Sequence, residues 1–248
     1  MIDELKRLLA KGPVTLDAAA CERLAAYHAL LLEWNGRMDL TNVPEEEMPL
    51  RHYADSLLPL ACGPWFVQGA RLIDVGTGAG FPGLPLAIAR PDLHVMLLDS
   101  QRKRCDFLEA VKLELGLENV RVLHARAEDA ARGELRENMH LAVARAVAPL
   151  NVLCEYLLPF VAVGGCALCW KGPAVHAERE EGRRAAALLG AEEKELIRLP
   201  IAGREHYVQP YLKTEKTVRR YPRKSGIPAK DPLGKKKETS KKEEKTRE

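Results

Sequence analysis

The sequence predicts an α/β protein with a mostly parallel sheet. From Arg71 onward, short apolar segments alternate with segments of helical periodicity, and this alternation is typical of a parallel sheet covered by helices on both faces. A glycine-rich loop, Gly76-Thr77-Gly78-Ala79-Gly80, directly follows the first apolar segment. Residues 1–65 show helical patterns only, so we expect a helical cap in front of an α/β domain that spans residues 66–233.

The predicted cap contains two main helices. In the first, Asp17 is a suitable N-cap and Asn35-Gly36 a suitable end. Its apolar residues recur at helical spacing, at Leu24, Tyr27, Leu31 and Trp34. The second helix begins near Pro49, because proline is favoured in the first turn. Three polar residues then lie on one side of it, namely His52, Asp55 and Ser56.

Five apolar segments of the α/β region are predicted strands. They cover Leu72–Val75, His94–Leu98, Val120–Leu123, Leu141–Ala144 and a segment that ends at Trp170-Lys171-Gly172. One helix follows the glycine-rich loop and stops before Pro91. Ser100 is predicted to cap the next helix, which Gly116 ends.

The composition is that of a globular chain of 248 residues, 46% of them hydrophobic. No run approaches the roughly 20 apolar residues that cross a membrane, and the N-terminus, with Asp3 and Glu4, is unlike a signal peptide. Cys166 and Cys169 form a C-x-x-C pair within a predicted buried strand, which favours a structural role over a zinc site. We therefore expect a cytoplasmic protein, a monomer without a metal.

Positive charge is concentrated at the C-terminal end. Residues 213–248 contain 14 basic and 6 acidic residues, a net charge of +8, which leaves −5 for residues 1–212 against +3 for the whole chain. This asymmetry indicates either a polyanionic partner or a solvated tail. Residues 234–248 contain no hydrophobic side chain, and we expect them to form a disordered basic tail.

The glycine-rich loop predicts a ligand site. Gly76 and Gly78 allow the backbone to turn sharply and approach a ligand, at the strand ends where such sheets bind them. Asp99 ends the next strand, 19 residues after Gly80, where it can accept hydrogen bonds from ribose hydroxyls. Ala127 and Glu128 follow the third strand, near the expected adenine edge.

Two cofactors use a site of this kind, NAD and S-adenosylmethionine. The NAD fingerprint places its third glycine three positions after the second, where this chain has Phe81. Phe81 and Pro82 also leave little room for a pyrophosphate at the helix N-terminus. The loop therefore favours S-adenosylmethionine, and an NAD-dependent oxidoreductase is the less favoured alternative.

Several segments together resemble the RsmG (GidB) family of ribosomal RNA methyltransferases. They are Asp74–Ile88, Leu97-Leu98-Asp99-Ser100, Arg126-Ala127-Glu128, Ala144–Leu150, Tyr221-Pro222-Arg223-Lys224, and His52 with Asp55-Ser56-Leu57. The resemblance implies a Rossmann-like class I methyltransferase fold with a mostly parallel, seven-stranded sheet. It also implies methylation of guanine N7 in 16S ribosomal RNA, with cofactor contacts at Gly76, Phe81, Ala127, Glu128 and Arg145. The chain departs from the family at Asp39, where an asparagine is usual.

The fourth strand agrees with this implication by elimination. It leads into Ala144-Arg145-Ala146-Val147, not the N-P-P-Y type motif common in amine methylation, and no cysteine nucleophile is present there. Guanine N7 carries a lone pair and no proton, so its methylation needs no base. Positioning of the reacting atoms can lower the activation barrier by roughly 7–11 kcal/mol. Arg145 is the candidate catalytic residue.

The candidate RNA contacts are basic residues and two cap residues. They are His52, Asp55, Lys171, Arg219, Arg220, Arg223 and Lys224. Helix capping is an equal alternative for His52 and Asp55. The expected partner is 16S ribosomal RNA or the small ribosomal subunit. A noncatalytic RNA-binding or assembly factor that retains the fold is the second alternative.

Overall fold

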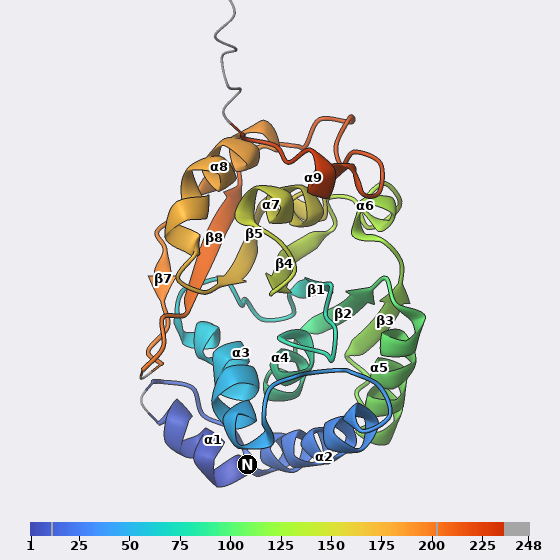
Figure 1. Cartoon of the computed structure of the whole chain (residues 1–248), viewed down its shortest axis with the longest axis vertical. Coiled ribbons are helices and arrows are strands. Elements are labelled where there is room, and N and C mark those ends of the chain that lie inside the picture. Colours follow the sequence, from blue (N-terminus) through green and yellow to red (C-terminus); the bar gives the residue numbers. More distant parts are fainter. Residues whose placement is uncertain (11, 202, 236–248) are drawn as a thin grey trace, which may run out of the picture.

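The computed structural model describes residues 1–10, 12–201 and 203–235. Its centre is an eight-stranded sheet of order β3-β2-β1-β4-β5-β8-β6, with β7 paired to β8 (Figure 1). The strands are β1 (Arg71–Val75), β2 (His94–Asp99), β3 (Val120–His124), β4 (Met139–Arg145), β5 (Val161–Lys171), β6 (Ala191–Glu193), β7 (Ile197–Arg198) and β8 (Tyr207–Lys213). β1 to β5 pair in parallel, whereas β8 is antiparallel to β5, β6 and β7. The mostly parallel sheet is confirmed, and the two-residue β7 adds one strand to the expected seven.

Helices cover both faces of this sheet. They are α4 (Gly83–Ala89), α5 (Arg102–Glu114), α6 (Ala127–Ala130), α7 (Leu150–Leu157), α8 (Val175–Leu188) and α9 (Ile227–Lys230). β1 shows how the two cores arise, because successive side chains of a strand point to opposite faces. Leu72 joins the core beneath α4 and α5, while Ile73 and Val75 join the core beneath α7 and α8.

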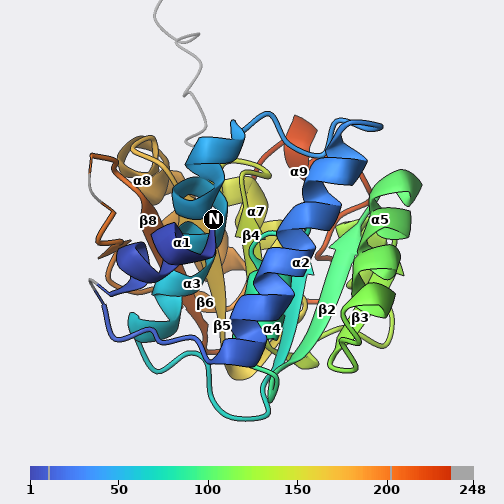
Figure 2. The same cartoon turned by 90° about the horizontal axis from the view of Figure 1, so that it is seen from below.

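The N-terminal cap consists of α1 (Ile2–Leu9), α2 (Ala18–Asn35) and a run of short turns. These turns are Glu45–Glu47, the π-helix Pro49–Ala54, α3 (Asp55–Leu57) and Leu58–Ala61. Asp17 caps α2, accepting a hydrogen bond from the Ala20 amide at 2.7 Å, as the sequence predicts. Figure 2 shows α2 crossing the sheet beside α4 and α5, and Leu24 shares their core with Phe107. The predicted boundaries at residues 65 and 233 remain predictions.

One predicted cap is wrong. α5 begins at Arg102 after Gln101, and no side chain caps it. The Asp99 carboxylate accepts the hydrogen bond of the Gln101 amide at 2.9 Å, so the residue before Ser100 shapes this turn.

The C-x-x-C pair lies in β5, where both cysteines are buried. Burial raises the pKa of the Cys166 thiol to about 12, which keeps it protonated and unreactive. Within the described residues no cluster of histidine, cysteine and carboxylate side chains could hold a metal ion. Nor does that part of the chain contain a helix long and apolar enough to span a bilayer. Residues 236–248, where most of the predicted tail falls, lie outside the described residues.

Candidate active site

The glycine-rich loop joins β1 to α4 at the carboxyl edge of the sheet. The amides of Gly76 and Thr77 donate to the carbonyl of Leu98, at 2.8 and 3.2 Å, which ties the loop to β2. Gly76 has φ +70°, and a Cβ there would lie 2.9 Å from Val147 Cγ2. Gly78 has φ +62°, and a Cβ there would meet nothing within 4 Å. The backbone at Gly78 therefore borders open space, as a ligand-binding loop requires.

Asp74 lies beneath this loop and is fully buried. Its Oδ2 accepts hydrogen bonds from the Thr77 hydroxyl at 2.6 Å and the Gly83 amide at 2.8 Å. Its Oδ1 has no hydrogen-bond partner among the residues that the structure describes. Burial raises the pKa of Asp74 to about 6. A buried acceptor without a partner is costly, and beside a ligand loop it suits a cationic ligand group.

Asp99 stands at the end of β2, as predicted, with its carboxylate held by backbone amides. Oδ2 accepts from the Gly78 amide at 3.0 Å and Oδ1 from the Gln101 amide at 2.9 Å. Arg104 lies 3.7 Å from Oδ2. The carboxylate is thus oriented beside the loop, and its remaining acceptor capacity suits hydroxyl donors.

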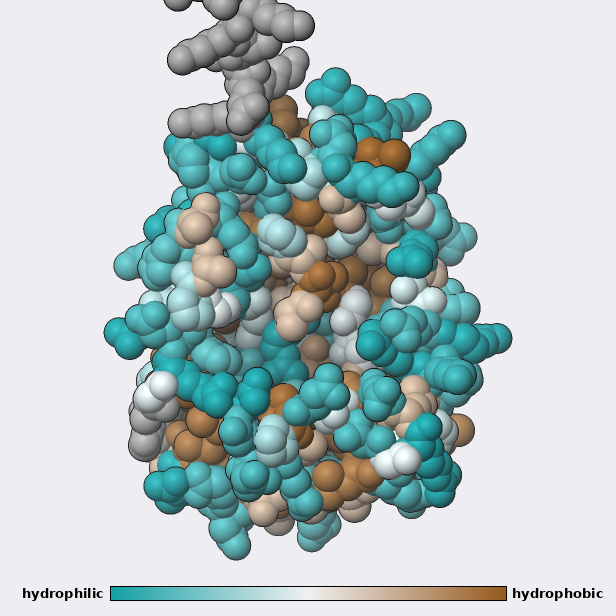
Figure 3. All heavy atoms as spheres, viewed as in Figure 1, coloured by the Kyte–Doolittle hydropathy of each residue, from teal (hydrophilic) through white to brown (hydrophobic). Residues whose placement is uncertain are grey.

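Three adjoining cavities lie along the carboxyl edge of the sheet. The first, about 270 Å³, is lined by residues that include Gly76, Ser100, Ala127, Glu128 and Ala229. The second, about 190 Å³, is lined by residues that include Gly76, Gly78, Phe81, Arg104 and Arg145. The third, about 300 Å³, is lined by residues that include His52, Asp55, Arg145, Lys171, Arg204 and His206. Gly76 lines the first two, and Arg145 and His52 line the second and third, so the cavities form one row. In Figure 3 the surface is hollowed between the cap and the α7 region, with both hydrophobic and hydrophilic residues around the hollow.

Arg145 ends β4 and lies where the second and third cavities meet. Its guanidinium donates to Asp55 Oδ2 at 3.0 Å and to the Arg51 carbonyl at 2.7 Å. The same group lies over the Phe81 ring, 5.0 Å from the centroid. Arg145 therefore reaches back from the sheet to the cap, which its place in the sequence does not reveal.

His52 completes this arrangement as a neutral ring. Its Nδ1 lies 3.1 Å from an Arg145 guanidinium nitrogen, and its Nε2 lies 2.8 Å from the Thr41 hydroxyl. Arg145 can only donate, so Nδ1 accepts and Nε2 carries the proton. Burial, and then the charge of Arg145, lower the pKa of His52 to about 3. The ring also stacks on Phe81, with centroids 4.4 Å apart.

Asp55 connects the cap to β5 and to the residue that precedes β8. Its Oδ1 lies 2.8 Å from His206 Nδ1, and its backbone carbonyl accepts from Trp170 Nε1 at 2.9 Å. The structure thus brings together the predicted residues His52, Asp55 and Arg145, and places Lys171 in the same cavity, 2.7 Å from Glu178.

Sequence reasoning missed several lining residues of the third cavity. They are Arg51, Trp170, Arg204 and His206. Arg204 donates to Glu47 Oε2 at 3.0 Å, and Arg51 donates to the same oxygen at 2.9 Å. Arg51 directly precedes His52, which the sequence had already indicated, so this adjacent arginine could have been identified as a candidate too. The loop that carries Arg204 and His206 has no motif that could have indicated them.

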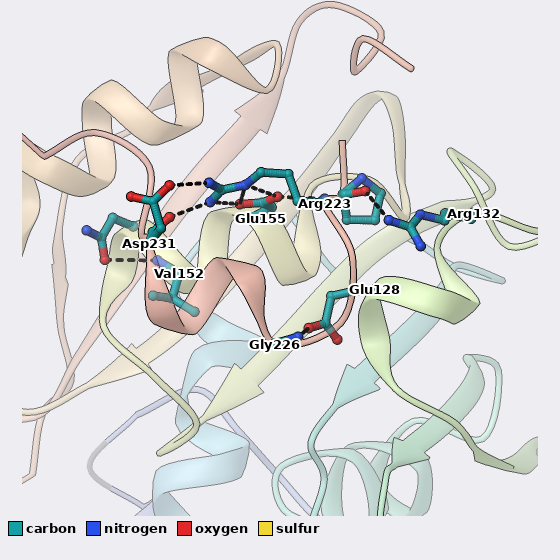
Figure 4. Close-up of polar contacts among 9 residues, drawn as sticks. Glu128, Arg132, Val152, Glu155, Arg223, Gly226 and Asp231 are labelled. Carbon is teal, nitrogen blue, oxygen red and sulfur yellow. Dashed lines mark hydrogen bonds and ion pairs between the residues drawn. The ribbon is translucent and has the colours of Figure 1, made fainter. Parts of the chain in front are cut away.

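The guanidinium of Arg223, one of the predicted RNA contacts, is directed toward the protein. Arg223 NH2 lies 2.7 Å from Oε2 of Glu155, a fully buried carboxylate on α7, and NH1 lies 3.1 Å from Asp231 Oδ2 (Figure 4). Its neighbours Arg219, Arg220 and Lys224 are exposed, as a phosphate contact requires, but none of them lines the three cavities.

Glu128 lines the first cavity, but one of its oxygens is already bonded. Its Oε1 accepts from the Gly226 amide at 2.8 Å (Figure 4). Gly226 belongs to residues 217–234, which we call the C-terminal strap. Glu128 therefore lies against a segment that follows it by nearly a hundred positions.

This sheet order, with a glycine-rich loop after β1 and an acid at the end of β2, defines a Rossmann-like fold. Phe81, in place of the third glycine of the NAD fingerprint, favours the S-adenosylmethionine-dependent methyltransferases within it. Solved structures agree with the fold. A mutant 16S rRNA (adenine(1408)-N(1))-methyltransferase from Catenulisporales acidiphilia aligns with TM-score 0.51 and 15% identity over 60% of this chain and 87% of its own. The YcgJ protein from Bacillus subtilis aligns with TM-score 0.50 and 13% identity over 66% of this chain and 100% of its own.

The chain belongs to the rRNA small subunit methyltransferase G family (GidB), whose model matches residues 20–207. Ribosomal RNA small subunit methyltransferase G of Alkaliphilus oremlandii is 43% identical over 93% of this chain and 99% of its own length. The same-named protein of Desulfitobacterium hafniense is 44% identical over 89% and 92%. The predicted family and enzyme class are confirmed, and S-adenosylmethionine is the methyl donor of this class.

Proposed function

We propose that this protein transfers the methyl group of S-adenosylmethionine to guanine N7 in 16S ribosomal RNA of the small subunit. The observation that carries the proposal is the row of three cavities that meet at Gly76 and at Arg145. The first would take the adenosyl group, the second the methionine part, and the third the target base. The names of the relatives support ribosomal RNA as the substrate.

The residues present fit the cofactor. Asp99, oriented by the Gly78 amide, would accept the ribose hydroxyls, and Ala127 with Glu128 would border the adenine. The unpartnered Oδ1 of buried Asp74 suits the methionine ammonium group, and Arg104 in the second cavity suits its carboxylate. When bound, the sulfonium group supplies an electrophilic methyl.

The third cavity fits a reaction that needs positioning rather than a base. His52 cannot remove a proton, because Nδ1 is occupied by Arg145 and its pKa lies near 3. Guanine N7 has no proton to lose, so no base is required. Transfer would break the bond between sulfur and the methyl carbon, release the cofactor as a neutral thioether and leave the positive charge on the base. The Asp55 carboxylate on this cavity would stabilise that charge.

Two groups of cations would hold the RNA. Arg51, Lys171 and Arg204 line the third cavity, and the exposed Arg219, Arg220 and Lys224 lie on the strap. Contacts of this kind go to phosphates and fix the register of the RNA. We propose that the protein acts in the cytoplasm as a monomer, and gel filtration tests the oligomeric state.

A labelled methyl-transfer assay tests the proposal. The protein is incubated with small subunits and methyl-labelled S-adenosylmethionine, and the label is followed into 16S ribosomal RNA. We expect the label to enter the RNA. The labelled base that is released from this RNA should be guanine methylated at N7. RNA binding without transfer to RNA, either free or in subunits, would instead show the noncatalytic assembly factor.

A further inference from the structure

The C-terminal strap, residues 217–234, is fastened across α6 and α7 by side chains of the sheet domain. Arg136 donates to the carbonyls of Tyr221 and Thr217, both at 2.7 Å. Arg132 donates to the Pro222 carbonyl at 3.0 Å. These contacts join residues more than eighty positions apart, so the strap is part of the folded domain.

Arg223 connects the C-terminal end of the short helix α9 to α7. It precedes the helix, and its guanidinium binds Glu155 through both carboxylate oxygens. The same group donates to the carbonyl of Asp231, which directly follows the helix, at 2.7 Å. Figure 4 shows Arg223 between Glu155 and Asp231. Because Glu155 is fully buried on α7, this pairing fixes α9 relative to the core.

The opposite side of the strap is fastened to the residues that follow β3. The Gly226 amide donates to Glu128 Oε1 at 2.8 Å, and the Ser225 hydroxyl donates to Asp129 Oδ2 at 2.9 Å. Gly226 has φ +83°, a conformation that favours glycine. Three residues further on, Ala229 lines the first cavity together with Ala127 and Glu128. α9 is therefore a wall of that cavity.

We propose that the strap forms one wall of the S-adenosylmethionine cleft and that Arg223 is a positioning residue for cofactor binding, not an RNA contact. This inference rests on the proposed function, because it takes the first cavity as the adenosyl site. The neighbouring Lys224 differs in role, since its side chain is exposed and it touches RNA phosphates. Two adjacent basic residues thus serve the two substrates separately.

The test compares Arg223→Gln with Lys224→Gln in steady-state methyl transfer to small subunits, varying each substrate in turn. Arg223→Gln should raise KM for S-adenosylmethionine by roughly tenfold, which corresponds to about 1.4 kcal/mol of binding free energy, with little change in KM for RNA. Lys224→Gln should raise KM for RNA and leave KM for the cofactor unchanged. The reverse pattern, or an Arg223→Gln enzyme with normal cofactor KM, overturns the proposal.

A second pair of variants avoids the buried ion pair. Ala229→Phe places a bulky side chain in the cleft from an exposed position, and Lys230→Phe places the same bulk one residue further on. Only Ala229→Phe should weaken S-adenosylmethionine binding in calorimetry. Equal affinities in the two variants overturn the strap inference while wild-type activity upholds the proposed function. Wild-type protein that transfers no methyl group removes the proposed function itself.

Discussion

Arg145 connects the second cavity to the third, since it lines both and binds Asp55 of the cap. Arg145→Ala should abolish methyl transfer, and Arg145→Lys should rescue poorly, because a lysine cannot bind Asp55, the Arg51 carbonyl and the Phe81 face together. Breaking this buried pair should also lower the free energy of unfolding by about 3 kcal/mol.

The double variant Arg145→Met with Asp55→Asn separates these two effects. It removes the unpaired buried charge, so thermal unfolding should return toward wild type while methyl transfer stays absent. Full activity of any Arg145 variant at saturating cofactor would show that this side chain is not part of the reaction.

Asp74 gives the fold a defined pH dependence. Burial raises its pKa from 3.8 to about 6, so the folded protein holds a proton there that the unfolded chain has already lost. This stabilising contribution is present below pH 3.8 and is lost as the pH rises through about 6. Asp74→Asn should therefore exceed wild type in free energy of unfolding by about 3 kcal/mol near pH 8, and the difference should vanish near pH 4.

The same variant should bind S-adenosylmethionine more weakly, because an amide cannot neutralise an ammonium group. Urea unfolding at several pH values and calorimetry provide the two measurements. A stability gain that is the same at every pH would contradict the assignment of the raised pKa to Asp74.

The helix α4 presses against the sheet through Gly83. A Cβ there would lie 2.4 Å from Leu97 Cδ2 and 2.8 Å from Asp74 Oδ2. Gly83→Ala should thus cost about 1–3 kcal/mol of stability. Gly36→Ala is the matched control, because its Cβ would have only ordinary contacts and its φ is −67°. Chemical denaturation of both variants decides the point, and equal stabilities would mean that α4 can shift without cost.

At the scale of elements, local patterns were sufficient for most of the fold. The strands that end at Val75 and Asp99 and the cap of α2 at Asp17 were predictable, because periodicity and capping depend on neighbouring residues. β6, β7 and β8 were not placed from the sequence. β6 and β7 have only three and two residues and carry no periodic signal, and β8 contains Pro210, which argues against a strand.

The candidate site was predictable only in part for a related reason. Gly76 follows β1 and Asp99 ends β2, so both could be assigned to the candidate site from the local sequence. Arg223 could not, because its buried partner Glu155 is 68 residues away. Nor could the strap be placed over Glu128, 98 residues before its partner Gly226. A basic residue within a basic segment is expected to be exposed to solvent and to contact RNA. Only the folded structure shows which of these basic residues faces the protein interior.

For the whole molecule, the central claim is methyl transfer to guanine N7 in 16S ribosomal RNA. The most direct measurement is the mapping of N7-methylguanine in this RNA, by cleavage at the methylated base, from cells with and without the protein. We expect one guanine of this RNA to lack its N7 methyl group when the protein is absent. Wild-type protein should restore it, and Arg145→Ala should not. An unchanged pattern of N7-methylguanine in cells without the protein would contradict the account.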